Sequence, residues 1–197
     1  MTDVPIDHLD TFRAALADAG VTHDTVDPAR ATAAIASAVE EPVVGVPLSD
    51  ESDLDRALAD VELPEYVETD FAPSSLHAAT TGVTPVRLGV AALGSVLVRS
   101  GADGDELVAL YPERHVAVLA ASDVVPDLDA ATDWLDDEVD AGRDSYVFAT
   151  GVSATADMGA LVEGVHGPTN VHVVLVDDRD VPAHDEPSNR EPTTSNA

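Results

Sequence analysis

Residues 146–176 read YVFATGVSATADMGALVEGVHGPTNVHVVLV. The apolar runs at 146–150 and 171–176 are typical of buried β-strands. Between them, Met158, Leu161 and Val162 recur at a spacing that favours a short helix. The stretch therefore predicts a strand, a helix and a second strand, which is the repeating unit of an α/β fold.

The same alternation extends toward the N-terminus. Apolar periodicity and capping residues predict helices over 5–20, 28–41 and 127–142. Short apolar runs predict strands at 43–46, 85–90, 95–100, 106–111 and 115–121, with a hairpin turn at 100–105. The expected fold is α/β, with a mixed, mainly parallel sheet flanked by helices.

Three segments follow from this pattern. Residues 1–42 are expected to form an N-terminal helical segment that packs on the core, and residues 43–177 a single α/β domain. Residues 178–197 lack apolar periodicity and are rich in Pro, Ser, Thr, Asn and Asp, so a disordered acidic and polar tail is expected there.

Charge is the strongest compositional signal. Acidic residues number 38 against nine basic ones, all of them Arg, and the net charge is −29. Such a surface repels phosphate backbones and anionic lipids, which argues against nucleic-acid binding and membrane insertion. The composition resembles that of proteins from salt-accumulating archaea, so we expect folding to require salt.

The cysteine count and the apolar runs narrow the setting. No cysteine is present, which excludes disulfides and thiolate-bound zinc or iron–sulfur clusters on this chain. No apolar run approaches the roughly 20 residues that span a bilayer, and a cytoplasmic protein without a cofactor of its own is expected.

The first candidate site follows the strand at 146–150. Gly151, Ser153, Thr155 and Asp157 lie where the expected helix begins, and a helix start after a glycine turn can bind an anion through backbone N–H groups. The alternative is structural: Thr155 caps the helix, Asp157 occupies its first turn, and Gly151 permits the turn.

His166 is the second candidate, between Gly164 and Gly167. A loop histidine can act as a general acid or base or donate to a carboxylate, and it can equally be an ordinary surface residue. A metal site is not expected, because His166 and His172 lack the i, i+4 spacing of a compact zinc motif. We expect Ser153, Thr155, Asp157 and His166 to line one pocket.

The stretch TADMGALVEGVHGP, residues 155–168, strongly resembles the C-terminal signature of the LUD-domain family. Other family elements occur in the same order, namely GVT at 82–84, AALGS at 91–95 and YPERHVAVL at 111–119. The likeness covers roughly residues 5–177. Two departures stand out: Ala92 replaces a family Glu, and Ala154 and Gly159 replace a family Arg and Glu.

The resemblance implies a fold like that of NagB, ribose-5-phosphate isomerase and CoA transferases. It also implies an accessory role in oxidising L-lactate to pyruvate beside iron–sulfur partner proteins, with a small carboxylate or phosphate as ligand. His166 is then the candidate catalytic residue, and the substrate-binding candidates are Gly94, Ser95, Gly151, Ser153, Thr155, Asp157, Gly164 and Gly167. Two alternatives stay open: a stand-alone enzyme acting on a phosphorylated or CoA-linked metabolite, and a degenerate ligand-binding relative.

Overall fold

The structure, a computed structural model, describes residues 8–49, 58–152, 154–157, 160–163 and 167–179. The helices within these ranges are α1 His8–Asp18, α2 Pro28–Ala38, α3 Pro73–Ala78, α4 Asp105–Leu110, α5 Leu128–Asp140 and the short 3₁₀ helix η1 Ala121–Asp123. The strands are β1 Thr22–Val26, β2 Val43–Gly45, β3 Thr81–Pro85, β4 Leu88–Val90, β5 Ser95–Arg99, β6 Arg114–Ala120, β7 Val124–Val125, β8 Tyr146–Thr150, β9 Ala154–Asp157, β10 Ala160–Glu163 and β11 Asn170–Val176.

Five strands form sheet A, in the order β1-β11-β6-β3-β2, and all four pairings are parallel. Its central strands β6 and β11 are buried along almost their whole length. Strands of a parallel sheet covered on both faces read as continuous apolar runs, which is why both were recognisable in the sequence. The expected α/β fold with a mainly parallel sheet is confirmed.

Four strands form the smaller sheet B, in the order β7-β4-β5-β8. Strand β5 runs antiparallel to β4 and to β8, while β4 and β7 are parallel. The hairpin turn predicted at 100–105 is wrong, because that segment leads from β5 into helix α4, and the antiparallel pair is instead β4 with β5.

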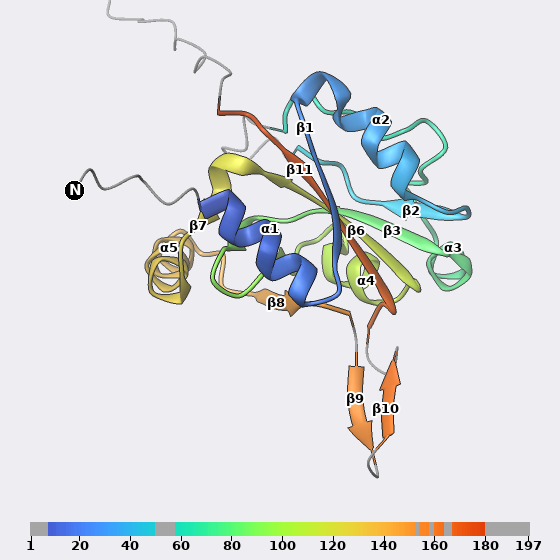
Figure 1. Cartoon of the computed structure of the whole chain (residues 1–197). Helices are drawn as coiled ribbons and strands as arrows, with labels where there is room; N and C mark the ends of the chain where they lie inside the picture. Colours follow the sequence, from blue (N-terminus) through green and yellow to red (C-terminus); the bar gives the residue numbers. More distant parts are fainter. Residues whose placement is uncertain (1–7, 50–57, 153, 158–159, 164–166, 180–197) are drawn as a thin grey trace, which may run out of the picture.

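Side-chain alternation along sheet A assigns its two faces. Val116 and Val118 of β6 pack with Ile35 of α2, whereas Ala117 and Leu119 face α1 and sheet B. On the far face of sheet B, apolar residues pack against Ala131 and Trp134 of α5. The order of layers is therefore α2, sheet A, α1 with sheet B, and α5 (Figure 1).

The structure differs from the sequence-based prediction in the N-terminal segment. Helices α1 and α2 are present, but β1 separates them and pairs in parallel with β11. Strand β1 reads THDTV, with only one aliphatic residue, because it lies at the edge of sheet A and is largely exposed. Its sequence therefore lacks the apolar run by which the other strands were found.

The predicted strand at 106–111 is also wrong, because Asp105–Leu110 forms helix α4. Gly104 precedes this helix in a left-handed conformation, with φ of 81°, and acidic residues occupy the first turn. Acidic residues at a helix start interact favourably with its dipole, a signal that outweighs the short apolar run.

The predicted helix after Gly151 is wrong as well. Strands β9 and β10 pair antiparallel, with Thr155 opposite Val162 and Asp157 opposite Ala160, and they extend away from both sheets (Figure 1). A helix of this length is marginal, and Gly159 within it would cost about 1 kcal/mol relative to Ala. Cross-strand pairing of β-branched Thr155 and Val162 favours the hairpin instead.

The hairpin changes how the flanking strands relate. Strand β8 belongs to sheet B and β11 to sheet A, so the two are not parallel neighbours. The strand–helix–strand unit expected from residues 146–176 is thus replaced by a connection between the two sheets.

No helix in the described part of the chain is both long and apolar enough to cross a bilayer.

Candidate functional site

A cavity of about 280 Å³ lies where sheet A and sheet B meet, beside α4. Most of its lining residues are aliphatic, and the polar residues among them are Glu106, His115 and Thr150. The lining comprises Val98, Glu106, Ala109, Leu110, His115, Val147, Phe148, Ala149, Thr150, Gly151, Val152, Gly167, Pro168 and Val171. A mostly apolar hollow with a few polar groups is the usual form of a small-molecule site.

His115 forms part of the sheet A wall. It is only 2% exposed, and its Nε2 lies 2.9 Å from the hydroxyl of Thr84 on β3. Burial lowers the pKa of His115 to about 4, so its imidazole is neutral at pH 7. A neutral imidazole in this wall contributes hydrogen bonding and no positive charge.

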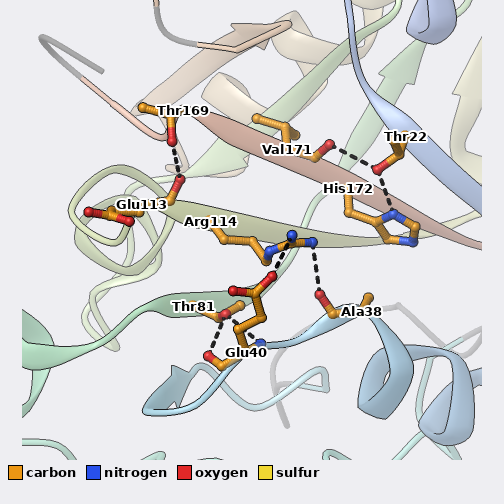
Figure 2. A network of polar contacts seen from close by, with 9 residues as sticks. All are labelled: Thr22, Ala38, Glu40, Thr81, Glu113, Arg114, Thr169, Val171 and His172. Carbon is orange, nitrogen blue, oxygen red and sulfur yellow. Dashed lines mark hydrogen bonds and ion pairs between the residues drawn. The ribbon is translucent and has the colours of Figure 1, made fainter. Parts of the chain in front are cut away.

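The residue before His115 fixes the amino end of β6 on the opposite face of sheet A. Arg114 donates to the backbone oxygen of Ala38 at 3.1 Å and to the carboxylate of Glu40 at 2.9 Å (Figure 2). The backbone of Glu40 is bonded in turn to the hydroxyl of Thr81 on β3. This network joins α2 to two strands of sheet A, and strand alternation then directs His115 to the cavity side.

A second polar side chain drawn in Figure 2 is His172 of β11, on the same face of sheet A as Arg114. Nδ1 of His172 lies 2.8 Å from the hydroxyl of Thr22, and Nε2 lies 3.4 Å from the carboxylate of Asp24 (Figure 2 draws the contact with Thr22). Burial lowers the pKa of His172, and the nearby Asp24 opposes that shift. The contacts attach edge strand β1 to β11, so this histidine holds the sheet and lies outside the cavity lining.

Glu106 is the one acidic residue of the described lining. It lies in the first turn of α4, and its carboxylate accepts a hydrogen bond of 2.5 Å from the hydroxyl of Ser100. On β8, Thr150 Oγ1 lies 2.5 Å from Oγ of Ser95, its cross-strand partner, and strand alternation places this pair on the α5 side of sheet B with Leu97. The arrangement presents a hydrogen-bond acceptor and a neutral imidazole to a bound molecule.

Arginine side chains line a different hollow. Arg99 and Arg143 lie around a surface depression at residues 99–103 and 142–145. Arg143 forms a two-bonded ion pair with Glu138, which also accepts from the hydroxyl of Tyr146, and these contacts hold the pKa of Glu138 below its usual range. The positive charge near sheet B is therefore outside the cavity between the sheets.

The structure brings two of the predicted site residues, Gly151 and Gly167, into the cavity lining, and a third, Ser95, bonds to Thr150. Gly94 and Gly151 have positive φ, of 61° and 72°; Gly94 approaches Ala15 in α1, and Gly151 approaches Ala19 just after it. A Cβ at Gly94 would lie 2.6 Å from the carbonyl carbon of Ala15, so this glycine is required for packing.

The other five predicted residues were assigned to a helix start and a turn. Ser153, Gly164 and His166 lie outside the described residues, and of Thr155 and Asp157 only the backbone in β9 is described. Because residues 154–157 form a strand, the helix dipole invoked for an anion site is absent there. A shared pocket for Ser153, Thr155, Asp157 and His166 stays a prediction. Within the described ranges, no three His, Asp or Glu side chains come together as they would around a metal ion.

Sequence reasoning missed Glu106, His115 and Thr150 as lining residues. The acidic start of α4, after Gly104, was the available signal for Glu106. His115 lies in the stretch YPERHVAVL, which had been noted only as a family element. Thr150 follows an apolar run, and nothing in the sequence indicates that β8 joins sheet B rather than sheet A.

The chain is similar to known proteins of one family. The family model described as the LUD domain matches residues 50–176. Lactate utilization protein C from Geobacillus sp. (strain WCH70) is 31% identical over 105 residues, which are 51% of this chain and 44% of that protein. The protein of the same name from Bacillus subtilis (strain 168) is 32% identical over 105 residues, with the same coverage. The alignments thus span less than half the length of these curated relatives.

Among solved structures, the chain is similar to a DUF162 family protein from Deinococcus radiodurans. The TM-score is 0.63 at 22% sequence identity, and the match covers 86% of this chain and 96% of the other. At that identity the likeness concerns the fold, and it extends over both sheets rather than over one of them.

Proposed function

This chain belongs to the LUD-domain family, and we propose that it is an accessory protein of L-lactate oxidation to pyruvate. The observation that carries the proposal is the family match over residues 50–176, which contains the whole of sheet B, the cavity lining and most of sheet A. Relatives at about 30% identity that are named lactate utilization protein C support it.

We further propose that the electrons of this oxidation are carried by iron–sulfur partner proteins. The sequence contains no cysteine, so thiolate-held clusters would have to be bound by residues outside it. We infer these partner proteins from the family resemblance. We also propose that the protein is cytoplasmic.

The cavity between the sheets is the proposed binding site. It combines an acceptor carboxylate and a neutral imidazole with apolar walls, and Gly151 and Gly167 of the family signature are among its lining residues. A small carboxylate or phosphate ligand was predicted for the segment that follows Gly151. The described lining contains no arginine that could pair with such an ion. We therefore propose that a carboxylate or phosphate would be bound by residues 153–166.

His166 keeps its proposed role in proton handling or in orienting a carboxylate. Its neighbours in sequence, Gly167 and Pro168, line the cavity, which supports a position close to the site. The role is testable without knowledge of its contacts, because His77 on α3 offers a matched exposed histidine remote in sequence.

The experiment is deletion of the gene in its native host, followed by growth on L-lactate. We expect growth to fail and to return with the wild-type gene and with His77→Ala, whereas His166→Ala should restore it poorly. Normal growth of the deletion strain, in a host without a second LUD-domain gene, would reject the lactate role. A fully active His166→Ala variant would reject only the role of that histidine and would favour a non-catalytic binding protein.

A further inference from the structure

The charge of the cavity lining limits what the cavity can bind. Glu106 is the one acidic residue of the described lining, and His115 is held neutral by burial. None of the arginines of the described ranges is among the lining residues. The described lining therefore offers no cation to pair with a bound anion.

The segment that adjoins the cavity cannot reverse this balance. Residues 153–166 read SATADMGALVEGVH and contain neither Arg nor Lys, while they add Asp157 and Glu163. Whatever contacts these side chains make, His166 is the only group among them that can become positive. The two ends of the segment, Val152 and Gly167, both line the cavity.

Desolvation acts in the same direction as charge. A bound anion gives up its hydration, and proteins compensate with arginine, lysine, a metal ion or several converging N–H groups. The lining here is mostly aliphatic, and Glu106 is its one acidic residue. An apolar surface of this kind gains by excluding water from another apolar surface.

We infer that the cavity binds an uncharged, largely apolar molecule carrying a hydrogen-bond donor, and not a small carboxylate or phosphate. The donor faces Glu106, whose carboxylate accepts one bond from Ser100 and has lone pairs for another. A cavity of about 280 Å³ accommodates a molecule of two or three rings.

This inference rests on the cavity being the binding site of the proposed function, and it names the ligand class of that site. Two fluorescent probes separate the possibilities, because they share one skeleton and differ by a sulfonate. N-phenyl-1-naphthylamine is uncharged and has one N–H donor, and 8-anilino-1-naphthalenesulfonate is its anionic counterpart. Both brighten when they leave water for an apolar site.

Titration of the full chain in concentrated KCl is the first measurement. We expect the uncharged probe to bind at least about tenfold more tightly than the sulfonate, which corresponds to the repulsion and desolvation of one charge. Glu106→Gln should narrow this ratio by strengthening binding of the sulfonate. Equal or tighter binding of the sulfonate in the cavity would overturn the inference.

Substitutions inside and outside the cavity show where the probe binds. Val147→Trp fills the cavity from β8 and should weaken the uncharged probe at least about tenfold, while Val139→Trp on the exposed side of α5 should leave it unchanged. Leu110 of α4 lines the cavity and is only partly buried, so Leu110→Ala should fold normally and weaken the same probe about fivefold. A sulfonate signal that survives Val147→Trp comes from elsewhere, with the depression around Arg99 and Arg143 as the first candidate.

The outcomes separate this inference from the proposed function. Binding of the uncharged probe that is insensitive to both Val147→Trp and Leu110→Ala would overturn the inference, whatever the growth experiment gives. Normal growth of the deletion strain on lactate would reject the lactate role, whereas selective binding in the cavity would stand.

Discussion

Sheets A and B are both built from short aliphatic strands, but the layers that cover them differ. Strands β6 and β11 of sheet A are enclosed by α2 on one face and by α1 and sheet B on the other. In sheet B, edge strand β8 is only half-buried, and its outer cover is α5. Sheet A thus holds most of the buried core, while sheet B supplies the wall of the cavity that a ligand can reach.

The covering helices differ in charge as well as in position. Six of the thirteen residues of α5 are acidic and none is basic, whereas α2 carries one Arg and no acid. Helix α5 is therefore attached to sheet B by apolar contacts that work against electrostatic repulsion. The comparison predicts that the two halves of the molecule respond differently to salt, to backbone substitutions and to pH.

The largest expected effect is on salt dependence. Trp134 of α5 is the only tryptophan, and its ring lies 5.4 Å from the ring of Tyr146 at the start of β8, so its fluorescence reports the sheet B side. As KCl is lowered from about 1 M to about 10 mM, the Debye length rises from roughly 3 Å to 30 Å. We expect the Trp134 emission to shift to longer wavelength at a KCl concentration where far-ultraviolet circular dichroism still shows most of the secondary structure.

Charge-neutralising variants of α5 provide the control. Asp133→Asn and Asp137→Asn alter exposed carboxylates, and together they should move the Trp134 transition to lower KCl without shifting the circular dichroism transition as far. Coincident transitions would show that the two sheets lose structure together. A native signal from both probes at about 10 mM KCl would contradict the expected need for salt.

The next effect concerns Gly94, where sheet B approaches α1, and Gly20, in the turn between α1 and β1. Gly94 combines positive φ with a Cβ position 2.6 Å from the backbone of Ala15, so Gly94→Ala should lower the free energy of unfolding by about 2–5 kcal/mol. Gly20 has positive φ of 76° and open space around it, so Gly20→Ala should cost only about 1 kcal/mol. Urea denaturation at constant high salt measures both.

The same two variants test whether Gly94 serves packing or ligand binding. It was predicted as a substrate-binding residue from its place in the motif AALGS, and the structure gives it a packing role against α1. If Gly94→Ala proves no more destabilising than Gly20→Ala, the close approach of α1 to sheet B is wrong. If Gly94→Ala keeps its stability and loses binding of the uncharged probe, a ligand role regains support.

The sequence predicted sheet A far better than the connection between the sheets. Buried parallel strands leave apolar runs, as in β6 and β11, and capping residues such as Asp27 and Asp127 mark helices α2 and α5. Edge strand β1 leaves no such run, and the short run of α4 suits a strand or a helix equally. Local pattern thus identifies elements that are buried or long, and it fails for those that are exposed or short.

The predicted ligand-binding residues stay a prediction, but Gly151 and Gly167 line the cavity, because they flank a segment that leaves sheet B and returns to sheet A. Glu106 and His115 come from α4 and β6, 45 and 36 residues before Gly151, and no local pattern connects them with it. Their convergence depends on the arrangement of the two sheets, which periodicity does not specify.

The smallest expected effect is a pH dependence that comes from sheet A. The pKa of His115 is about 4 in the folded chain, below the 6.5 of an exposed histidine. As pH falls below about 6.5 the unfolded chain binds the proton first, so stability that is fully present above that pH is lost progressively toward pH 4. At about pH 5.5 the loss should be on the order of 1 kcal/mol.

The slope of stability against pH isolates this histidine from the many carboxylates. His115→Gln keeps a hydrogen-bonding side chain beside Thr84 and should flatten the wild-type slope between about pH 7 and pH 5.5, whatever it costs at pH 7. His77→Gln alters an exposed histidine of α3 and should leave the slope unchanged. Urea denaturation at several pH values in concentrated KCl measures the three proteins side by side. Parallel slopes for wild type and His115→Gln would mean that His115 is not held neutral in the folded protein, and the charge balance inferred for the cavity would then have to be revised.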